Sequence, residues 1–197
     1  MKNWFAAASL GVAASLTVSA VADDDHGGRH QGKRVFRAEL VSYDEVPSVS
    51  SPARGQFYAV LNKEENQLTY WLSFSGLTAD VSQSHIHFGQ HHTNGGIVVW
   101  LCEGTGTTAP SDKTPACGML PTRGATVTGV ITPAEVVGLG VGTLNQGIGL
   151  GEFAELIAAM RAGAAYANVH SGALAPTTTP PTPNTGFPGG EIRGQIN

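Results

Sequence analysis

Four histidines lie close together near the middle of the chain. His85 and His87 are separated by one residue, and His91 and His92 follow within the next five positions. Side chains two positions apart in a β-strand point to the same face, so a strand here places the His85 and His87 imidazoles side by side. Neighbouring imidazoles can bind one transition metal at about 2.0–2.1 Å. The pattern predicts a copper or zinc site, with a further ligand from His91 or His92.

The same His-x-His pattern is also typical of an ordinary polar strand face. In that case the imidazoles form hydrogen bonds with neighbours or solvent, while Ile86 and Phe88 face the core. His170 lies much later in the chain. It joins His85 and His87 only if the fold places its strand beside theirs. The residues leave both interpretations open.

The elements that must position these histidines are mostly strands. Alternation of apolar and polar residues with period two is typical of half-buried antiparallel strands. The Asn94-Gly95 dipeptide favours positive φ in a hairpin turn between two of them. The sequence predicts an all-β fold, an antiparallel Greek-key-like β-sandwich or barrel. We expect about eight strands, at Val35–Val41, Gly55–Leu61, Gln67–Leu77, Ser84–Phe88, Ile97–Leu101, Ala125–Ile131, Tyr166–His170 and Glu191–Ile196.

Two short helices and one long loop interrupt the strand pattern. Thr132 and Glu135 form a capping box around a proline at the first helical position. Glu152–Ala162 carries an apolar stripe, and Gly163 supplies the stop. Residues 175–186 are rich in proline and threonine, and proline lacks the backbone donor that a central strand needs. We expect a loop there.

Composition limits the class of protein. The chain has 197 residues, 11 Lys+Arg against 15 Asp+Glu, and a net charge of −4. This mild acidity argues against a nucleic-acid partner, which requires a basic face. Because 41% of the residues are hydrophobic and only 13% are charged, disorder throughout the chain is not expected either.

The N-terminal residues are typical of a secretory signal peptide. Residues 1–22 contain one lysine, a run of small and apolar residues, and Ala20-Val21-Ala22 as a cleavage site. The run is too short and too rich in alanine and serine for a membrane span of about 20 residues. We expect cleavage near Ala22, a disordered polar tail at residues 23–33, and a single domain at residues 34–197. The protein is then secreted or periplasmic, with no membrane span.

Export affects how the two cysteines are interpreted. Cys102 and Cys117 flank a loop rich in threonine and proline. An oxidising compartment favours a disulfide between them. The alternatives are two separate buried thiols or thiolate metal ligands.

Other chemistries find little support. No G-x-S-x-G nucleophile elbow is present. The glycines at positions 138–142 do not stand between a strand and a nucleotide-binding helix. Glu191 and Arg193 share a face of the last expected strand and are most simply a structural ion pair, or cross-strand partners of other charges. We assign no catalytic residue.

Several motifs together resemble the CHRD domain, a module named for chordin and common in exported microbial proteins. The resemblance covers roughly residues 34–197, and residues 175–186 are an insertion relative to the family pattern. It implies an all-β sandwich with no general enzymatic activity. The matching segments are Phe36–Leu40, Ser84–Gly89, Asn94–Val99, Met160–Gly163, Ala165–Ser171 and Phe187–Ile196.

The histidines are also similar in arrangement to those of copper/zinc superoxide dismutase. That resemblance implies copper ligands at His85, His87 and His170, a loop ligand at His91 or His92, and an anion-guiding Arg193. The sequence departs from the dismutase pattern because no zinc-ligating aspartate stands between His92 and His170. Asp112 lies inside the cysteine loop.

Two functions follow as hypotheses. The first is an exported, non-catalytic binding or structural module for an extracellular or periplasmic protein or surface partner. The alternative is a copper or zinc site on His85 and His87 with a metal-handling or dismutase-like role.

Overall fold

The computed structural model describes residues 32–104, 106–118, 122–139, 146–172 and 185–197. The expected signal peptide, the expected tail as far as Gln31, and residues 175–184 of the expected loop lie outside the described residues.

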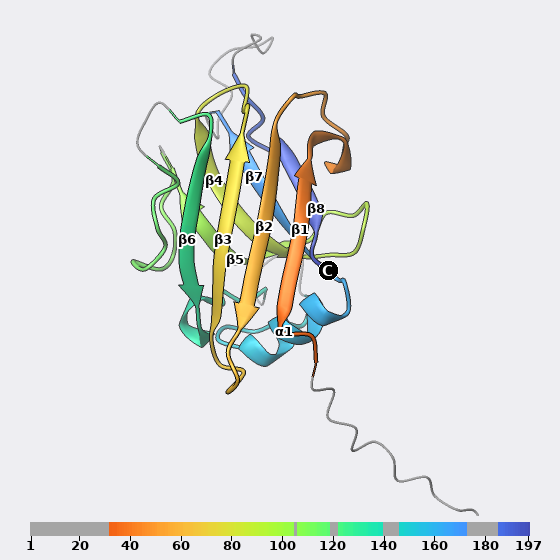
Figure 1. Ribbon diagram of the computed structural model, residues 1–197, viewed down its shortest axis with the longest axis vertical. Coiled ribbons are helices and arrows are strands. Elements are labelled where there is room, and N and C mark those ends of the chain that lie inside the picture. The colour runs from red at the N-terminus through yellow and green to blue at the C-terminus, as the bar shows by residue number, and fades with distance from the viewer. Residues whose placement is uncertain (1–31, 105, 119–121, 140–145, 173–184) are drawn as a thin grey trace, which may run out of the picture. The chain divides into compact units, whose positions relative to one another are not determined.

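Eight strands form one antiparallel sheet that curves into a nearly closed barrel (Figure 1). The strand order is β5-β4-β7-β8-β1-β2-β3-β6. In Figure 1, β6, β3, β2 and β1 form the front layer, and the other four strands lie behind it. The predicted all-β class is confirmed. The strands are β1 (Val35–Val41), β2 (Arg54–Leu61), β3 (Leu68–Ser75), β4 (Val81–Phe88), β5 (Gly96–Glu103), β6 (Ala125–Ile131), β7 (Ala165–Ser171) and β8 (Ile192–Gln195).

The core lies between the two layers, where strand alternation places the apolar side chains. From the front layer, Phe36, Phe57 and Leu72 are at most 1% exposed, and from the back layer Ile86 and Val169 are fully buried. Because neighbouring residues in a strand point to opposite faces, this burial decides which side chains lie on the outer face of each layer.

The two layers join where β1 meets β8. The ladder contains the single pair Val41↔Arg193, and Asn197 exchanges backbone hydrogen bonds of 2.7 and 2.8 Å with Arg37. Gly194 makes this approach possible, because a Cβ atom there would clash with the backbone oxygen of Glu39.

The local predictions are largely confirmed, with three differences. The β4–β5 hairpin forms, but its positive φ of 60° is at His92 rather than at Asn94-Gly95. The capping box is present around a short 3₁₀ helix, η2 (Pro133–Glu135), and the second helix is α1 (Phe153–Arg161). A further 3₁₀ turn, η1 (Ser42–Asp44), was not predicted.

The predicted disulfide is present. Cys102 and Cys117 are fully buried and joined by an S–S bond of 2.05 Å. It ties the end of β5 to the following loop, since Cys117 also donates its backbone N–H to Glu103 at 2.8 Å.

A buried carboxylate holds several distant segments together. Glu191 is fully buried and accepts hydrogen bonds from the hydroxyls of Ser51 and Ser171. It also accepts the Thr78 backbone N–H at 2.9 Å and the Thr78 hydroxyl at 3.2 Å. The expected partnership with Arg193 is therefore replaced by hydroxyl and amide donors from three separate segments.

Replacing this carboxylate should destabilise the fold. Glu191→Gln removes one charged acceptor oxygen and places an amide donor opposite buried donors, which costs about 2–3 kcal/mol. We expect urea denaturation to show this loss in the free energy of unfolding. Glu64→Gln, the same change at an exposed turn position, should alter it by less than about 0.5 kcal/mol. Equal effects of the two substitutions would contradict the role given to Glu191.

Candidate functional site

The two histidines of β4 and the one histidine of β7 lie on neighbouring strands. The ladder places His85 opposite Asn168, His87 opposite Tyr166, and Gln83 opposite His170. Since Ile86 on β4 is in the core, the alternating side chains of His85 and His87 lie on the outer face of this layer. Strand pairing thus brings His170 beside the His-x-His motif.

This outer face is polar but buried, so its histidines form hydrogen bonds with neighbouring groups rather than with solvent. His85 is 0% exposed, His170 6% and His87 8%. Loops from distant parts of the chain cover the face. The backbone oxygen of Gly95 lies 2.9 Å from His87 Nδ1, and that of Pro188 lies 2.8 Å from His170 Nδ1.

In His87 and in His170, both ring nitrogens face an acceptor oxygen, and the contacts of Nδ1 are the shorter ones. We therefore assign the proton to Nδ1, which donates it to the backbone carbonyl. In the neutral rings, each Nε2 then presents a lone pair. Both Nε2 atoms lie 3.1 Å from Asn168 Oδ1. His85 Nδ1 lies 3.2 Å from His170 Nε2.

The three histidines form a compact cluster of side chains that are able to ligate a metal. One ring nitrogen from each of His85, His87 and His170 lies within 4.8 Å of the others. A tetrahedral ion with ligand bonds of about 2.0–2.1 Å places its ligand atoms about 3.3 Å apart. The 3.2 Å separation of His85 and His170 already matches that spacing. His85 Nε2 is buried without a hydrogen-bond partner in the described structure.

Aromatic rings and one arginine surround the cluster. His87 stacks on Tyr166, with ring centres 4.8 Å apart and an interplanar angle of 1°, and Trp100 packs edge-on against His85 at 4.4 Å. The Arg193 guanidinium lies 3.4 Å from the centre of the Tyr166 ring. Arg193 also donates to the Thr93 carbonyl at 2.6 Å and is only 2% exposed. A loop thus holds the Arg193 side chain inside the protein. An anion-guiding arginine would instead be directed towards solvent.

Burial keeps the three imidazoles neutral. Together with the smaller effects of the neighbouring His170 and His87 rings, it lowers the pKa of His85 to about 2. Burial also lowers the pKa of His87 and of His170 to about 4, opposed by the hydrogen bonds to the Gly95 and Pro188 carbonyls. Metal ligation needs deprotonated imidazoles, so near pH 7 an ion displaces no proton from these rings.

Only part of the predicted ligand set comes together. His91 and His92 are exposed and pack against each other at 4.8 Å, outside the three-histidine cluster. Asn168, whose oxygen lies between two of the imidazoles, was missed by sequence reasoning. Its spacing of two residues from His170 on one strand was the available signal.

A model of a known protein family matches most of the chain. The CHRD domain model matches residues 36–176, well over half of the chain. The chain belongs to the CHRD family. The match includes His85, His87 and His170 but ends before Glu191 and Arg193. No curated protein matches the sequence.

Membership of the CHRD family favours a non-catalytic binding or structural module. The disulfide fits an exported protein. In the described part of the CHRD chain, no helix has the length and apolar character needed to cross a membrane.

Acid should destabilise the protein through the buried histidines. The folded protein holds them neutral, whereas the unfolded chain takes up protons below about pH 6.5. Their contribution to the free energy of unfolding is complete above that pH. It falls as the pH falls, by up to about 1.4 kcal/mol per pH unit for each histidine. This loss of stability ends near pH 4 for His87 and His170 and near pH 2 for His85, where the folded protein takes up the same proton. Urea unfolding between about pH 7.5 and about pH 5 measures this.

Glu45 changes the free energy of unfolding with pH in the opposite direction to the histidines and supplies the control. Burial raises its pKa to about 7, against the opposing effect of Arg193, so the folded state holds a proton there that the unfolded state has released. That contribution is complete below about pH 4.5 and is lost as the pH rises to about 7. Glu45→Gln should therefore steepen the loss of stability in acid. A Glu45→Gln protein of constant stability from about pH 7 to about pH 5 would contradict the neutral, buried histidines.

Proposed function

We propose that this CHRD-family chain is an exported, non-catalytic binding module, and that His85, His87 and His170 together bind one copper or zinc ion. The observation that carries the metal proposal is the pair of hydrogen bonds from the Nδ1 atoms of His87 and His170 to the Gly95 and Pro188 carbonyls. They direct two unprotonated Nε2 atoms into the same buried space.

This arrangement is the one that metal-binding histidines usually have. A ligating imidazole donates its other N–H to a carbonyl or carboxylate, which determines its tautomer and orientation. His87 and His170 both do so. Their two lone pairs face the acceptor oxygen of Asn168 at 3.1 Å. A cation would turn this group of acceptors into a ligand set, with the Asn168 oxygen beside the three nitrogens.

Burial favours binding of the ion over catalysis by it. Catalytic metal sites keep a coordination position open to water or substrate. The three imidazoles here are at most 8% exposed, and the Gly95 and Pro188 loops cover them. Asp112, the acidic residue considered as a zinc ligand, is exposed in the disulfide loop. The dismutase-like alternative therefore receives less support than metal binding.

Two features support a location outside the cytoplasm. The disulfide requires an oxidising compartment to persist. Residues 1–22 have the pattern of a signal peptide. The partner is accordingly an extracellular or periplasmic protein or surface.

Metal retention tests the proposal directly. The protein is loaded with Cu(II) or Zn(II), dialysed, and measured by elemental analysis beside a His85→Gln/His87→Gln variant. We expect the wild type to retain about one more equivalent than the variant, because two of its three nitrogen ligands are lost. Bound ion should also raise the thermal midpoint of the wild type, since the unfolded chain lacks the assembled site.

A second pair of histidines provides the matched control. His91→Gln/His92→Gln makes the same two changes on exposed side chains outside the cluster. This variant should retain as much metal as the wild type. Circular dichroism confirms that each variant is folded. Equal retention in all three proteins, or no retention by the wild type, would overturn the metal proposal and leave the binding-module proposal standing.

A further inference from the structure

The outer face of the front layer carries two rows of side chains that the core does not use. Pairing of β1, β2, β3 and β6 aligns Arg37, Tyr58, Trp71 and Thr128 across the four strands. The next row along the strands is Glu39, Gln56, Ser73 and Thr126. An aromatic row therefore runs beside a row of hydrogen-bonding side chains.

The aromatic row is partly open to solvent, with its two rings tilted by 47° to one another. Trp71 is 40% exposed, and its ring centre lies 5.5 Å from that of Tyr58. The Arg37 guanidinium packs 5.4 Å from the Tyr58 ring centre on the other side of the row. Exposed tryptophan and tyrosine rings combine large apolar faces with polar atoms, which suits ligands that have both characters.

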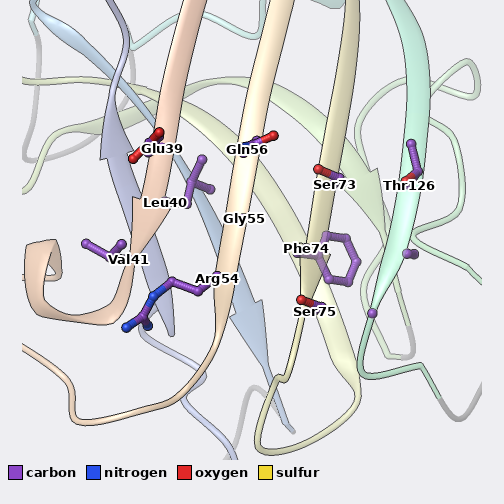
Figure 2. A pocket seen from close by; sticks show the side chains of 12 residues that line it. Glu39, Leu40, Val41, Arg54, Gly55, Gln56, Ser73, Phe74, Ser75 and Thr126 are labelled. Carbon is purple, nitrogen blue, oxygen red and sulfur yellow. The ribbon is translucent and has the colours of Figure 1, made fainter.

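The polar row lines two shallow hollows. All four of its residues line the first, and two of them also line the second. Figure 2 shows the first, of about 800 Å³, where Glu39, Gln56, Ser73 and Thr126 come from four adjacent strands. The second, of about 660 Å³, also includes Glu39 and Gln56 and continues to Tyr58.

The two hollows adjoin at Glu39 and Gln56 and together are called the depression. Trp71 lines neither hollow and lies on the neighbouring row. The four strands alone span about 14 Å at a spacing of about 4.8 Å, which is longer than a single sugar ring.

The charges of the depression balance. Its arginines are Arg37 and Arg54, and its acidic residues are Glu39 and Asp44. A phosphate chain or acidic polymer would need a net positive surface. The remaining polar lining consists mainly of amides and hydroxyls, which form hydrogen bonds with uncharged groups.

We propose that this outer face binds an uncharged oligosaccharide. The apolar faces of its sugar rings stack on Trp71 and Tyr58, and its hydroxyls form hydrogen bonds with Glu39, Gln56 and the neighbouring serine and threonine hydroxyls. The site is independent of the metal proposal, because neither hollow includes a residue of β4 or β7.

Calorimetric titration of the full chain with cellohexaose, chitohexaose and maltohexaose tests this proposal. At least one of these uncharged probes should bind. Trp71→Ala and Tyr58→Ala should each weaken that binding about tenfold or more, as for aromatic side chains at the centre of an interface. Trp71→Phe keeps an aromatic ring and should stay within about threefold of the wild type.

Tyr43→Ala is the matched control, because Tyr43 is an aromatic residue that is 63% exposed but lies on η1, outside both rows. It should bind the sugar like the wild type. All the front-face changes are on outward-facing side chains, and thermal denaturation confirms folding. The proposal fails if no uncharged probe binds at millimolar concentration, if only a hyaluronan hexasaccharide, an oligonucleotide or a peptide binds, or if Trp71→Ala binds as the wild type does.

Discussion

The fold depends on satisfying a layer of buried polar side chains on the outer face of β4, β7 and β8. Loops exclude water from this face, so each polar atom there needs a partner within the protein. The partners are mainly backbone carbonyls. Gly95 accepts from His87, Pro188 from His170, and Thr93 from Arg193. The conformations of the β4–β5 loop and of the segment before β8 are therefore coupled to the side chains beneath them.

Close backbone approaches make this covering possible, and two glycines provide them. Gly190 has a φ of 127° and packs against the Glu45 carboxylate, where a Cβ atom would clash. Gly194 allows β8 to approach β1 in the same way. Between them, Glu191 bonds to Ser51, Thr78 and Ser171, and so holds the segment that carries Pro188 beside β7. The segment Phe187–Ile196 thus supports the three-histidine cluster without contributing a side chain to it.

Period-two alternation was sufficient to predict the strands, because it depends on neighbours in sequence. β1 and β6 have the predicted bounds, and His85 and His87 share a face as expected. The alternation could not show what covers that face. The covering carbonyl of Pro188 lies 18 residues from His170 in the sequence, and Asn168 on β7 lies 81 residues from His87 on β4. For the same reason, proximity in sequence could not show that His91 and His92 lie outside the three-histidine cluster.

The two layers therefore use the same alternation to opposite effect. On the back layer, loops bury the outward side chains, so their tautomers and charges are determined by the fold, and any ligand there must be small enough to fit among them. On the front layer, Trp71 and its row stay open, and few internal contacts constrain them. Changes at the covered face should alter stability together with binding, since the same hydrogen bonds serve both. Changes at the open face can alter binding alone. The proposed ion site and the proposed oligosaccharide site therefore lie on opposite layers and share no strand residue of β4 or β7.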